Sequence, residues 1–336
     1  MGGWRVAWYI GASGIAMQQQ EQTLDTVGRG PGAQACHVGG AVLNAAVACA
    51  RLGQPTAYLT QVSSDLFGAQ ILAYLQANGV DIRHVLVDEA PSTLAFVERT
   101  PTTNRYAFYR TGAADTRWAP AALPTLPESC RFLHFGSISL LHEPAASRIT
   151  DLMAAHHGRQ VTLFDPNLRP SLLDGAAGLA RYRARCERWL ALTDLLKLSD
   201  EDAALLAPGV SLDEAAAGWL AQGPAAVVLT RGAEGATLYR PGHAPMAVTA
   251  PSVTVADTIG AGDTFAAGLS VALLERGVAH AAQLRTLGDA DWAAVLRFAA
   301  TAAALNCTRE GCDPPSRDAV RAALAGLADP PTAGAR

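Results

Sequence analysis

Short apolar runs alternate along the chain with longer segments in which apolar residues recur every three or four positions. The short runs are typical of buried strands, and the longer segments are typical of helices that pack one face against a core. Runs of the first kind are found at residues 56–60, 132–135, 161–164, 195–198 and 226–229. Segments of the second kind are found at residues 66–76, 144–156, 179–192, 212–222, 263–276, 292–306 and 317–327.

The order of these elements predicts a single α/β domain that spans residues 1–336. Strands that alternate with helices need right-handed crossovers, which build a mostly parallel sheet covered by helices on both faces. Two segments break the alternation, because residues 18–37 are polar and glycine-rich and residues 93–111 alternate like antiparallel strands. We therefore expect a three-layer α/β/α fold with a small β excursion.

Composition limits what this domain can be. The chain has 336 residues, of which 50% are hydrophobic and 17% are charged, so it can bury a large core without disulfides or structural metals. Its net charge of −4 argues against a nucleic-acid partner or an anionic membrane surface. No apolar stretch is long enough to span a bilayer, and the N-terminus lacks the pattern of a signal peptide. The six cysteines are scattered, which predicts reduced thiols in a cytoplasmic protein.

The most specific chemical motif is Asp257-Thr258-Ile259-Gly260-Ala261-Gly262-Asp263, between an expected strand at 253–255 and the helix that follows. Small residues at a helix start leave backbone N–H groups uncovered, and these groups bind anions together with the positive end of the helix dipole. Asp263 can accept the proton of an attacking hydroxyl while the amides around it stabilise a transferred phosphoryl group. The alternative is a glycine-rich connection in which Asp263 simply caps the helix.

A second glycine pair precedes another expected helix. Gly39 and Gly40 let a ligand approach the backbone, or let a segment hinge. Asn44 offers a donor and an acceptor at the helix start, which suits a sugar hydroxyl. The alternative is an ordinary turn followed by a cap.

Together these motifs resemble the two signatures of the ribokinase-like (PfkB) carbohydrate kinases, and most closely those of bacterial fructokinases. The first signature is matched by Gly39-Gly40…Asn44, Ala50-Arg51-Leu52-Gly53 and Asp65-Leu66-Phe67-Gly68, and the second by residues 257–263. The resemblance implies an ATP-dependent sugar kinase with a ribokinase-like fold, whose small β lid is built from the segments 14–37 and 93–111. It implies that Asp263 is the general base and that Gly260, Ala261 and Gly262 form the anion hole.

Further stretches resemble substrate-binding elements of the same family. Asp165-Pro166-Asn167-Leu168-Arg169 follows an expected strand, and ligands of α/β folds bind at the carboxyl ends of strands. Phe108-Tyr109-Arg110 resembles a lid strand that touches the substrate. The alternatives are a capped turn with a surface arginine and an ordinary edge strand. The resemblance assigns substrate binding to Gly39, Gly40, Asn44, Tyr109, Arg110, Asn167 and Arg169.

On the nucleotide side the resemblance rests on three stretches. Residues 197–202 resemble the family's Asn-x-x-Glu element, with Ser199 and Asp202 at its ends. Residues 230–235 resemble a turn on the nucleotide side of the site, and residues 307–311 resemble the turn that lines the purine. A charged helix N-terminus, which the helix dipole favours, is the alternative for the first. The resemblance assigns cofactor binding to Lys197, Ser199, Thr230, Gly232, Gly235 and Asn306.

Metal ions and assembly follow from the same resemblance. A kinase needs magnesium (Mg²⁺) with its ATP, because the metal bridges the phosphates and offsets their charge. We expect Asp202 to order water molecules bound to this metal. In family members that use a monovalent cation such as K⁺, a residue like Asp257 supplies a carboxylate to it. The resemblance also suggests a homodimer formed through the lid.

The sugar is open between two substrates. Residues 133–139 with Glu143-Pro144, and the turn at 307–309, favour fructose. Many family members have an aspartate in the first strand–turn that binds sugar hydroxyls, and here that position falls near Ala16. A hydroxyl without its acceptor costs about 1–3 kcal/mol of binding. The 2-keto-3-deoxygluconate kinases also tend to lack this aspartate, so that sugar acid, or the substrate of another PfkB-family kinase, is the alternative.

Two other classes of function compete with a kinase. A sugar- or nucleotide-binding sensor with weak or no catalysis would explain the missing aspartate, but it has no need of Asp263, Gly260 and Gly262. A nicotinamide dehydrogenase would use Gly11-Ala12-Ser13-Gly14, but that segment lacks the three-glycine spacing and a suitably placed acidic residue.

Overall fold

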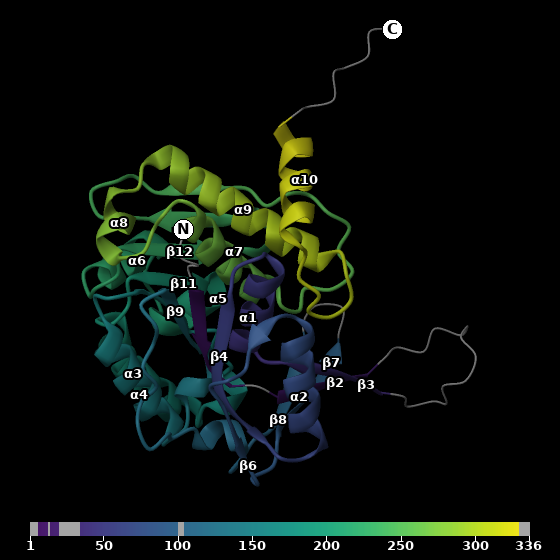
Figure 1. Ribbon diagram of the computed structural model, residues 1–336. Helices are drawn as coiled ribbons and strands as arrows, with labels where there is room; N and C mark the ends of the chain where they lie inside the picture. Colours follow the sequence, from purple (N-terminus) through teal and green to yellow (C-terminus); the bar gives the residue numbers. More distant parts are fainter. Residues whose placement is uncertain (1–5, 13, 20–33, 100–103, 329–336) are drawn as a thin grey trace, which may run out of the picture.

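The computed structural model describes residues 6–12, 14–19, 34–99 and 104–328. Ten strands of these residues form a sheet in the order β14-β13-β12-β11-β10-β9-β1-β4-β5, with β6 pairing with β4 (Figure 1). Neighbouring strands are parallel from β12 to β5, whereas β13 and β14 are antiparallel additions at one edge. The strands are β1 (Val6–Ile10), β4 (Thr56–Ser63), β5 (Val80–Asp81), β6 (Val85–Asp88), β9 (Cys130–Gly136), β10 (Val161–Asp165), β11 (Leu195–Ser199), β12 (Ala226–Thr230), β13 (Ala236–Tyr239) and β14 (Met246–Val248).

Helices cover both faces of this sheet, as the alternating pattern predicts. Because successive side chains of a strand point to opposite faces, one strand contributes to two cores: Leu163 of β10 packs in the first core and Phe164 in the second. The first core is covered by α1 (Ala41–Arg51), α2 (Leu66–Ala77), α7 (Ala261–Glu275), α8 (Ala281–Thr286), α9 (Asp289–Cys307) and α10 (Arg317–Ala328). The second is covered by α3 (Ala145–His156), α4 (Gly175–Leu190), α5 (Asp200–Leu206) and α6 (Leu212–Leu220). Short 3₁₀ turns complete the chain at η1 (Ala114–Arg117), η2 (Ser137–Leu140), η3 (Pro170–Leu172) and η4 (Gly232–Glu234).

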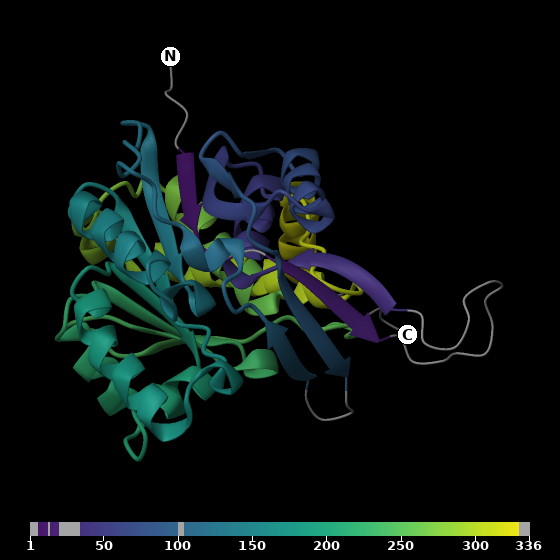
Figure 2. The ribbon, with the colours of Figure 1, turned by 90° about the horizontal axis from the view of Figure 1, so that it is seen from below.

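The two segments that break the alternation form a separate four-stranded sheet, which we call the lid. Its strands are β2 (Gly14–Gln19), β3 (Gln34–Gly39), β7 (Thr93–Arg99) and β8 (Asn104–Tyr109), in the order β3-β2-β7-β8. In Figure 2 these strands project from the side of the main body. Residues 20–33 and 100–103 of the two segments lie outside the described residues.

One expected strand is wrong. Residues 253–255 form an irregular loop instead, because the sheet edge ends at β14 and Pro251 lacks the N–H group that a further strand would need. Val255 is 58% exposed, and both Val253 and Val255 line a cavity. The apolar character of this segment therefore reflects the cavity wall and not burial in a sheet.

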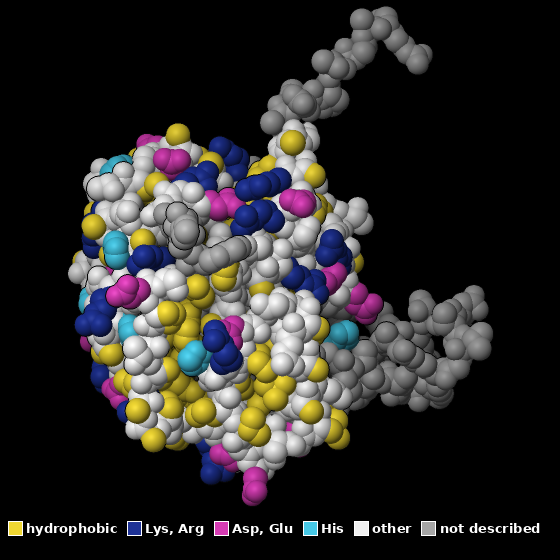
Figure 3. Space-filling view, viewed as in Figure 1, with side chains coloured by type: hydrophobic (Ala, Val, Ile, Leu, Met, Phe, Trp, Pro, Cys, Tyr) yellow, Lys and Arg dark blue, Asp and Glu magenta, His cyan; other side chains and the backbone are white. Residues whose placement is uncertain are grey.

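Charged and apolar side chains are distributed unevenly over the surface. On the face shown in Figure 3, basic and acidic side chains are mixed over α9 and α10, and apolar side chains gather in the lower half. Among the described residues, we find no helix with the length and apolar character needed to cross a membrane. The cysteines whose side chains are described are free thiols, namely Cys49, Cys130, Cys186, Cys307 and Cys312.

Candidate active site

A cavity of about 900 Å³ lies between the lid and the carboxyl ends of the parallel strands. The lid contributes Thr93, Ala95 and Phe108 to its wall. The turns after β9, β10, β11 and β12 contribute the opposite wall, and the first residues of α1 and α7 close the cavity from the first helical layer. This is the position at which open α/β sheets bind their ligands.

Asp263 lies in the first turn of α7, and its side chain is buried at the floor of the cavity. Its Oδ2 accepts a hydrogen bond of 2.8 Å from Asn44 Nδ2, and its Oδ1 accepts one of 3.3 Å from Asn167 Nδ2. These two partners are 219 and 96 residues away along the chain. Burial raises the pKa of Asp263, although the hydrogen bond from Asn44 and the charges of Lys197 and Arg169 lower it.

The N-terminus of α7 is open to a ligand. Its N-cap residue Gly260 has φ 77°, and no side chain of the described residues caps it. The first helix on the same wall, α1, begins in the same way after Gly40, which has φ 132° and no side-chain cap. Two helix N-termini with uncovered ends therefore face one cavity, which is a favourable arrangement for an anion.

Backbone strain is concentrated at the same place. Ser137 and Asn167, with φ 58° and 37°, are the non-glycine residues of the described chain that have a left-handed backbone, and both line the cavity. Such conformations are costly and persist where the surrounding structure holds them. Arg169 helps to hold Asn167, because its Nη1 donates to the Asn167 side-chain oxygen. The side-chain nitrogen of Asn167 is thereby oriented to donate its hydrogen bond to Asp263.

Lys197 and Asp165 form an ion pair below this floor. Lys197 Nζ lies 2.9 Å from Asp165 Oδ2, and each side chain is 4% exposed. Burial raises the pKa of Asp165 to about 6, although the charge of Lys197 lowers it. Burial lowers the pKa of Lys197, but the charges of Asp165 and Asp263 outweigh this effect and the pKa is raised.

Sequence comparison agrees with this geometry. The model of the pfkB family of carbohydrate kinases matches residues 13–319 of the chain. The chain belongs to this family. A fructokinase of Rhizobium leguminosarum bv. trifolii is 39% identical over 261 residues, which cover 77% of each chain. A 2-dehydro-3-deoxygluconokinase of Thermoproteus tenax is 32% identical over 247 residues, which cover 72% of this chain and 74% of that one.

Structural comparison gives the same result. A crystal structure of a fructokinase with bound ATP from Xylella fastidiosa superposes with a TM-score of 0.84 at 27% sequence identity, covering 96% of this chain and 99% of that one. The ribokinase-like fold and the assignment as an ATP-dependent carbohydrate kinase are thus confirmed.

Most of the predicted site residues of this pfkB-family kinase lie around the cavity. Lys197, Ser199 and Asp202 line it where β11 ends and α5 begins. Asp202 lies at the start of α5, where its Oδ1 accepts a hydrogen bond of 2.8 Å from the Leu168 amide. The remaining cavity-lining residues of the prediction are Gly39, Gly40, Asn44, Asn167, Arg169, Thr230, Gly232, Gly235, Gly260, Ala261, Gly262 and Asp263.

Two predicted residues support the anion site from behind without lining the cavity. Asn306 is fully buried, and its Nδ2 donates to the Ile259 carbonyl at 2.8 Å. Asn306 thereby holds the 257–260 turn, and its binding of the nucleotide stays a prediction. Asp257 accepts hydrogen bonds from the amides of Ile259 and Gly311, so it joins this turn to the one after α9.

The two lid residues of the prediction lie away from the cavity. Tyr109 is 65% exposed and packs edge-to-face against Phe96, because its side chain points to the outer face of β8. Arg110 is buried in an ion pair of 2.9 Å with Asp115. Phe108, one residue earlier and on the inner face, lines the cavity, and substrate binding by Tyr109 and Arg110 stays a prediction.

Several residues of the cavity wall are not among the predicted site residues. Ser137 and Ile138 follow β9, and the loop at 250–255 was expected to be partly a strand. Ala300, Ala303 and Ala304 face the cavity from α9. Small apolar residues on a helix look the same in sequence whether they line a cavity or a core, so only the three-dimensional arrangement distinguishes them.

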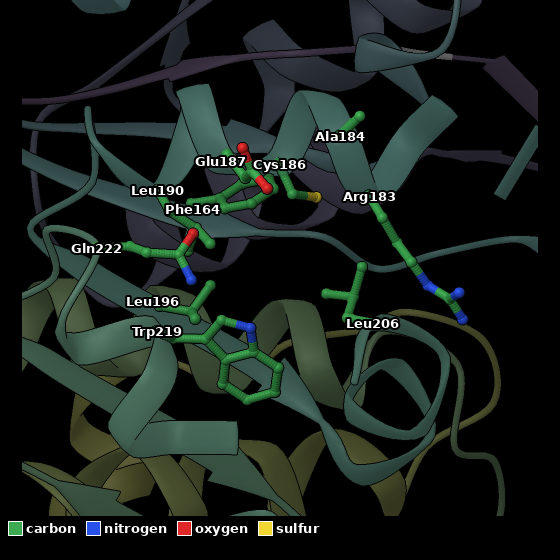
Figure 4. Close-up of a pocket in the computed structure, with 10 residues that line it drawn as sticks. All are labelled: Phe164, Arg183, Ala184, Cys186, Glu187, Leu190, Leu196, Leu206, Trp219 and Gln222. Carbon is green, nitrogen blue, oxygen red and sulfur yellow. The ribbon is translucent and has the colours of Figure 1, made fainter. Parts of the chain in front are cut away.

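A second cavity, of about 360 Å³, lies on the other face of the sheet (Figure 4). It is enclosed by α4, the end of α5, α6 and the strands β10 and β11. Phe164, Leu196 and Trp219 form its apolar wall, and none of the predicted site residues lines it.

Proposed function

We propose that this kinase transfers the γ-phosphoryl group of ATP to a hydroxyl group of fructose, with Asp263 as the general base. The observation that carries the proposal is the carboxylate of Asp263, buried in the cavity at the open N-terminus of α7 and oriented by Asn44 and Asn167. A base must lie within hydrogen-bond reach of the proton that it removes, and a shared cavity with uncapped helix amides meets this requirement.

The chemistry assigned to the residues is a direct transfer. The sugar O–H bond breaks as its oxygen forms a bond to the γ-phosphorus, the proton moves to the Asp263 carboxylate, and ADP leaves with the electron pair of the broken P–O bond. The amides of Gly260, Ala261 and Gly262 hold the charge on the transferred group. Burial raises the pKa of Asp263, which makes its carboxylate a stronger base.

Magnesium and a monovalent cation belong to the same proposal. Asp200, Glu201 and Asp202 line the cavity at the start of α5, so this segment has the oxygen ligands and the negative charge that suit Mg²⁺. The metal would offset the negative charge of the ATP phosphates. Asp202 would act through metal-bound water, since its carboxylate already accepts the Leu168 amide. Asp257 would supply a carboxylate to K⁺ beside the 257–260 turn.

Fructose is favoured by the relatives, and one observation favours a sugar acid. The Rhizobium fructokinase is 39% identical, whereas the Thermoproteus 2-dehydro-3-deoxygluconokinase is 32% identical. Arg169 lines the cavity next to Asn167, and a guanidinium suits a carboxylate well. The sugar acid 2-keto-3-deoxygluconate (2-dehydro-3-deoxygluconate) is therefore the second candidate.

A substrate panel tests the proposal. The purified enzyme with MgATP is assayed for ADP release with fructose, ribose and 2-keto-3-deoxygluconate, and kcat/KM is compared. We expect the largest value for fructose. A larger value for the sugar acid would replace fructose by the second candidate, and no ADP release above the sugar-free rate would favour a sensor.

The lid also supports a proposal about assembly. Leu94, Phe96 and Tyr109 lie on the face of the lid opposite to the cavity-lining residues, and Tyr109 is 65% exposed. An exposed aromatic residue of this kind suits a homodimer in which two lids pack together. Sedimentation of the enzyme and of the Tyr109→Asp variant would distinguish a dimer from a monomer. A cytoplasmic location, where ATP is available, completes the proposal.

A further inference from the structure

The ion pair between Lys197 and Asp165 is a feature of the cavity floor that the proposed reaction leaves unexplained. The two residues lie on the neighbouring parallel strands β11 and β10, and their side chains point toward the helical layer that contains α7. Taking two charges out of water is costly, and such a pair is weak evidence of stability alone. The position of the Lys197–Asp165 pair suggests that it also has a role in the reaction.

The ammonium group of Lys197 lies directly against the anion site. A Cβ atom placed on Gly262 would lie 3.1 Å from Lys197 Nζ, so the glycine leaves room for this group below the first turn of α7. Gly262 is one residue before Asp263, and Lys197 itself lines the cavity. The positive charge is thus fixed at the helix end where the transferred phosphate and the base are expected.

Asp165 determines where that charge lies. Its Oδ2 accepts the bond from Lys197 Nζ, while its Oδ1 has no hydrogen-bond partner among the described residues. Lys197 is therefore held from one side by Asp165 and is left to act on the groups above it.

The charged and titratable groups around this pair come from several elements. His134 on β9 faces Lys197, and its pKa is lowered to about 3 by burial and by the charge of Lys197. It is therefore neutral in the folded enzyme near pH 7. Around Asp263 and Lys197 the groups that interact electrostatically are Asp165, Arg169, Asp202, His134 and the thiol of Cys312. Lys197 and Arg169 are the cations of this set, and Lys197 is the only lysine in the chain.

We propose that Lys197 is a positioning residue of the reaction: held by Asp165 beneath the N-terminus of α7, its ammonium keeps Asp263 ionised and adds positive charge below the anion hole. This inference rests on the proposed function, because it assumes that Asp263 acts as a base. It differs from nucleotide binding by Lys197, because the proposed effect comes from the position of the ammonium beside Asp165 and Gly262 and needs no contact with ATP.

The first test does not depend on activity. Protein labelled with ¹³C at the lysine ε carbon gives the resonance of Lys197 alone, because the chain has no other lysine. Its chemical shift is followed from pH 3 to pH 9 in the wild type, in Asp263→Asn and in Asp165→Asn. We expect the Asp263→Asn curve to lose a titration step that the Asp165→Asn curve retains. Superimposable curves for the wild type and Asp263→Asn would overturn the proposal.

The second test uses the pH dependence of kcat/KM. Without the lysine charge Asp263 accepts a proton more readily, so Lys197→Met should move the acidic limb of the profile to higher pH. We expect the ratio of kcat/KM at pH 6 to that at pH 8 to fall about tenfold, the size of a single-charge effect at short range. An unchanged ratio would contradict the proposal.

A double variant separates charge from folding. Lys197→Met leaves Asp165 buried without its partner, whereas Lys197→Met/Asp165→Asn removes both charges. We expect the double variant to recover the thermal stability lost by the single one and to keep the shifted acidic limb. Recovery of the wild-type pH profile would show that the pair is only structural.

A matched control removes another buried cation. Arg240 is 5% exposed in its ion pair with Asp289, and neither residue lines the cavity. Arg240→Met/Asp289→Asn should lose stability without any change in the pH profile, and a shifted limb in this control would overturn the assignment to Lys197. If the Lys197 resonance depends on Asp263 but no sugar is phosphorylated, the proposed function fails while the charge coupling stands.

Discussion

The strands β10 and β11 pass between two cavities of opposite character. Toward the second helical layer they present Phe164 and Leu196, which line the cavity of about 360 Å³. One residue further along, Asp165 and Lys197 point to the other face, and Lys197 lines the cavity of about 900 Å³. Adjacent residues of the same strands therefore serve packing on one side and chemistry on the other.

The two cavities differ in the backbone strain and the buried charge at their walls. The small cavity is lined by apolar side chains of α4, α5, α6 and the sheet together with the polar side chains of Arg183, Glu187 and Gln222. The large cavity contains two strained residues, Ser137 and Asn167, and a buried ion pair with one unsatisfied oxygen. Backbone strain gathers where function requires it, and it is offset by good packing elsewhere.

The largest effect should come from the base itself. Asp263→Asn keeps the size of the side chain but cannot accept the proton, so kcat should fall roughly 10³-fold, within the usual range for general-base catalysis. Binding of ATP, measured by calorimetry, should be retained, because the helix amides are unchanged. Asp318→Asn, in the first turn of α10, is the matched control and should have wild-type activity. Full activity in Asp263→Asn would refute the general-base assignment.

Sequence analysis was successful for the parts of the site that depend on local chemistry. Asp263, Asn44 and Asn167 were predicted from motifs, and the fold brings these three side chains together by hydrogen bonds. A helix that starts with small residues and a carboxylate indicates an anion site from its local sequence alone.

Other parts of the site depend on which face of a strand a residue occupies and on partners far away in the sequence. Whether Phe108 or Tyr109 faces the cavity is decided by the pairing of β8 with β7, because a shift of one residue exchanges the two faces. The burial of Arg110 depends on Asp115, and the loop at 253–255 depends on where the sheet ends. No local pattern contains this information.

A change at the open end of α7 should have the next largest effect. Gly260 has φ 77°, and an added Cβ would lie 2.2 Å from Cys312 Sγ. Gly260→Ala should therefore cost about 1–3 kcal/mol of unfolding free energy and lower kcat/KM about tenfold, because the anion-binding amides move. Denaturant unfolding and the kinase assay measure the two effects.

The matched control for this change is another glycine at a helix start. Gly288 is the N-cap of α9 with φ −71°, and an added Cβ would meet no atom within 4 Å. Gly288→Ala should change stability by less than about 1 kcal/mol and leave kcat/KM unchanged. Equal losses for the two variants would mean that the conformation of Gly260 has no special role.

A smaller effect is expected at Asn167, where strain and contact can be separated. Asn167→Gly relieves the left-handed backbone but loses the amide that contacts Asp263, whereas Asn167→Ala loses the amide and keeps the strain. Both should lower kcat/KM about tenfold, the value of one hydrogen bond to a charged group. Asn167→Ala should be less stable than Asn167→Gly by about 1 kcal/mol. Equal stability would show that the backbone conformation is not held under strain.

The smallest effect on the reaction is expected from the small cavity. Leu206 lies at the end of α5 and is half-buried against the second core. Leu206→Ala removes apolar contacts there and should cost about 1–2 kcal/mol of unfolding free energy. Because the sheet separates Leu206 from Asp263, kcat and KM of the folded enzyme should stay at wild-type values. A fall in kcat that is out of proportion to the loss of folded protein would instead mean that the sheet transmits the change through β10 and β11 to Asp165 and Lys197.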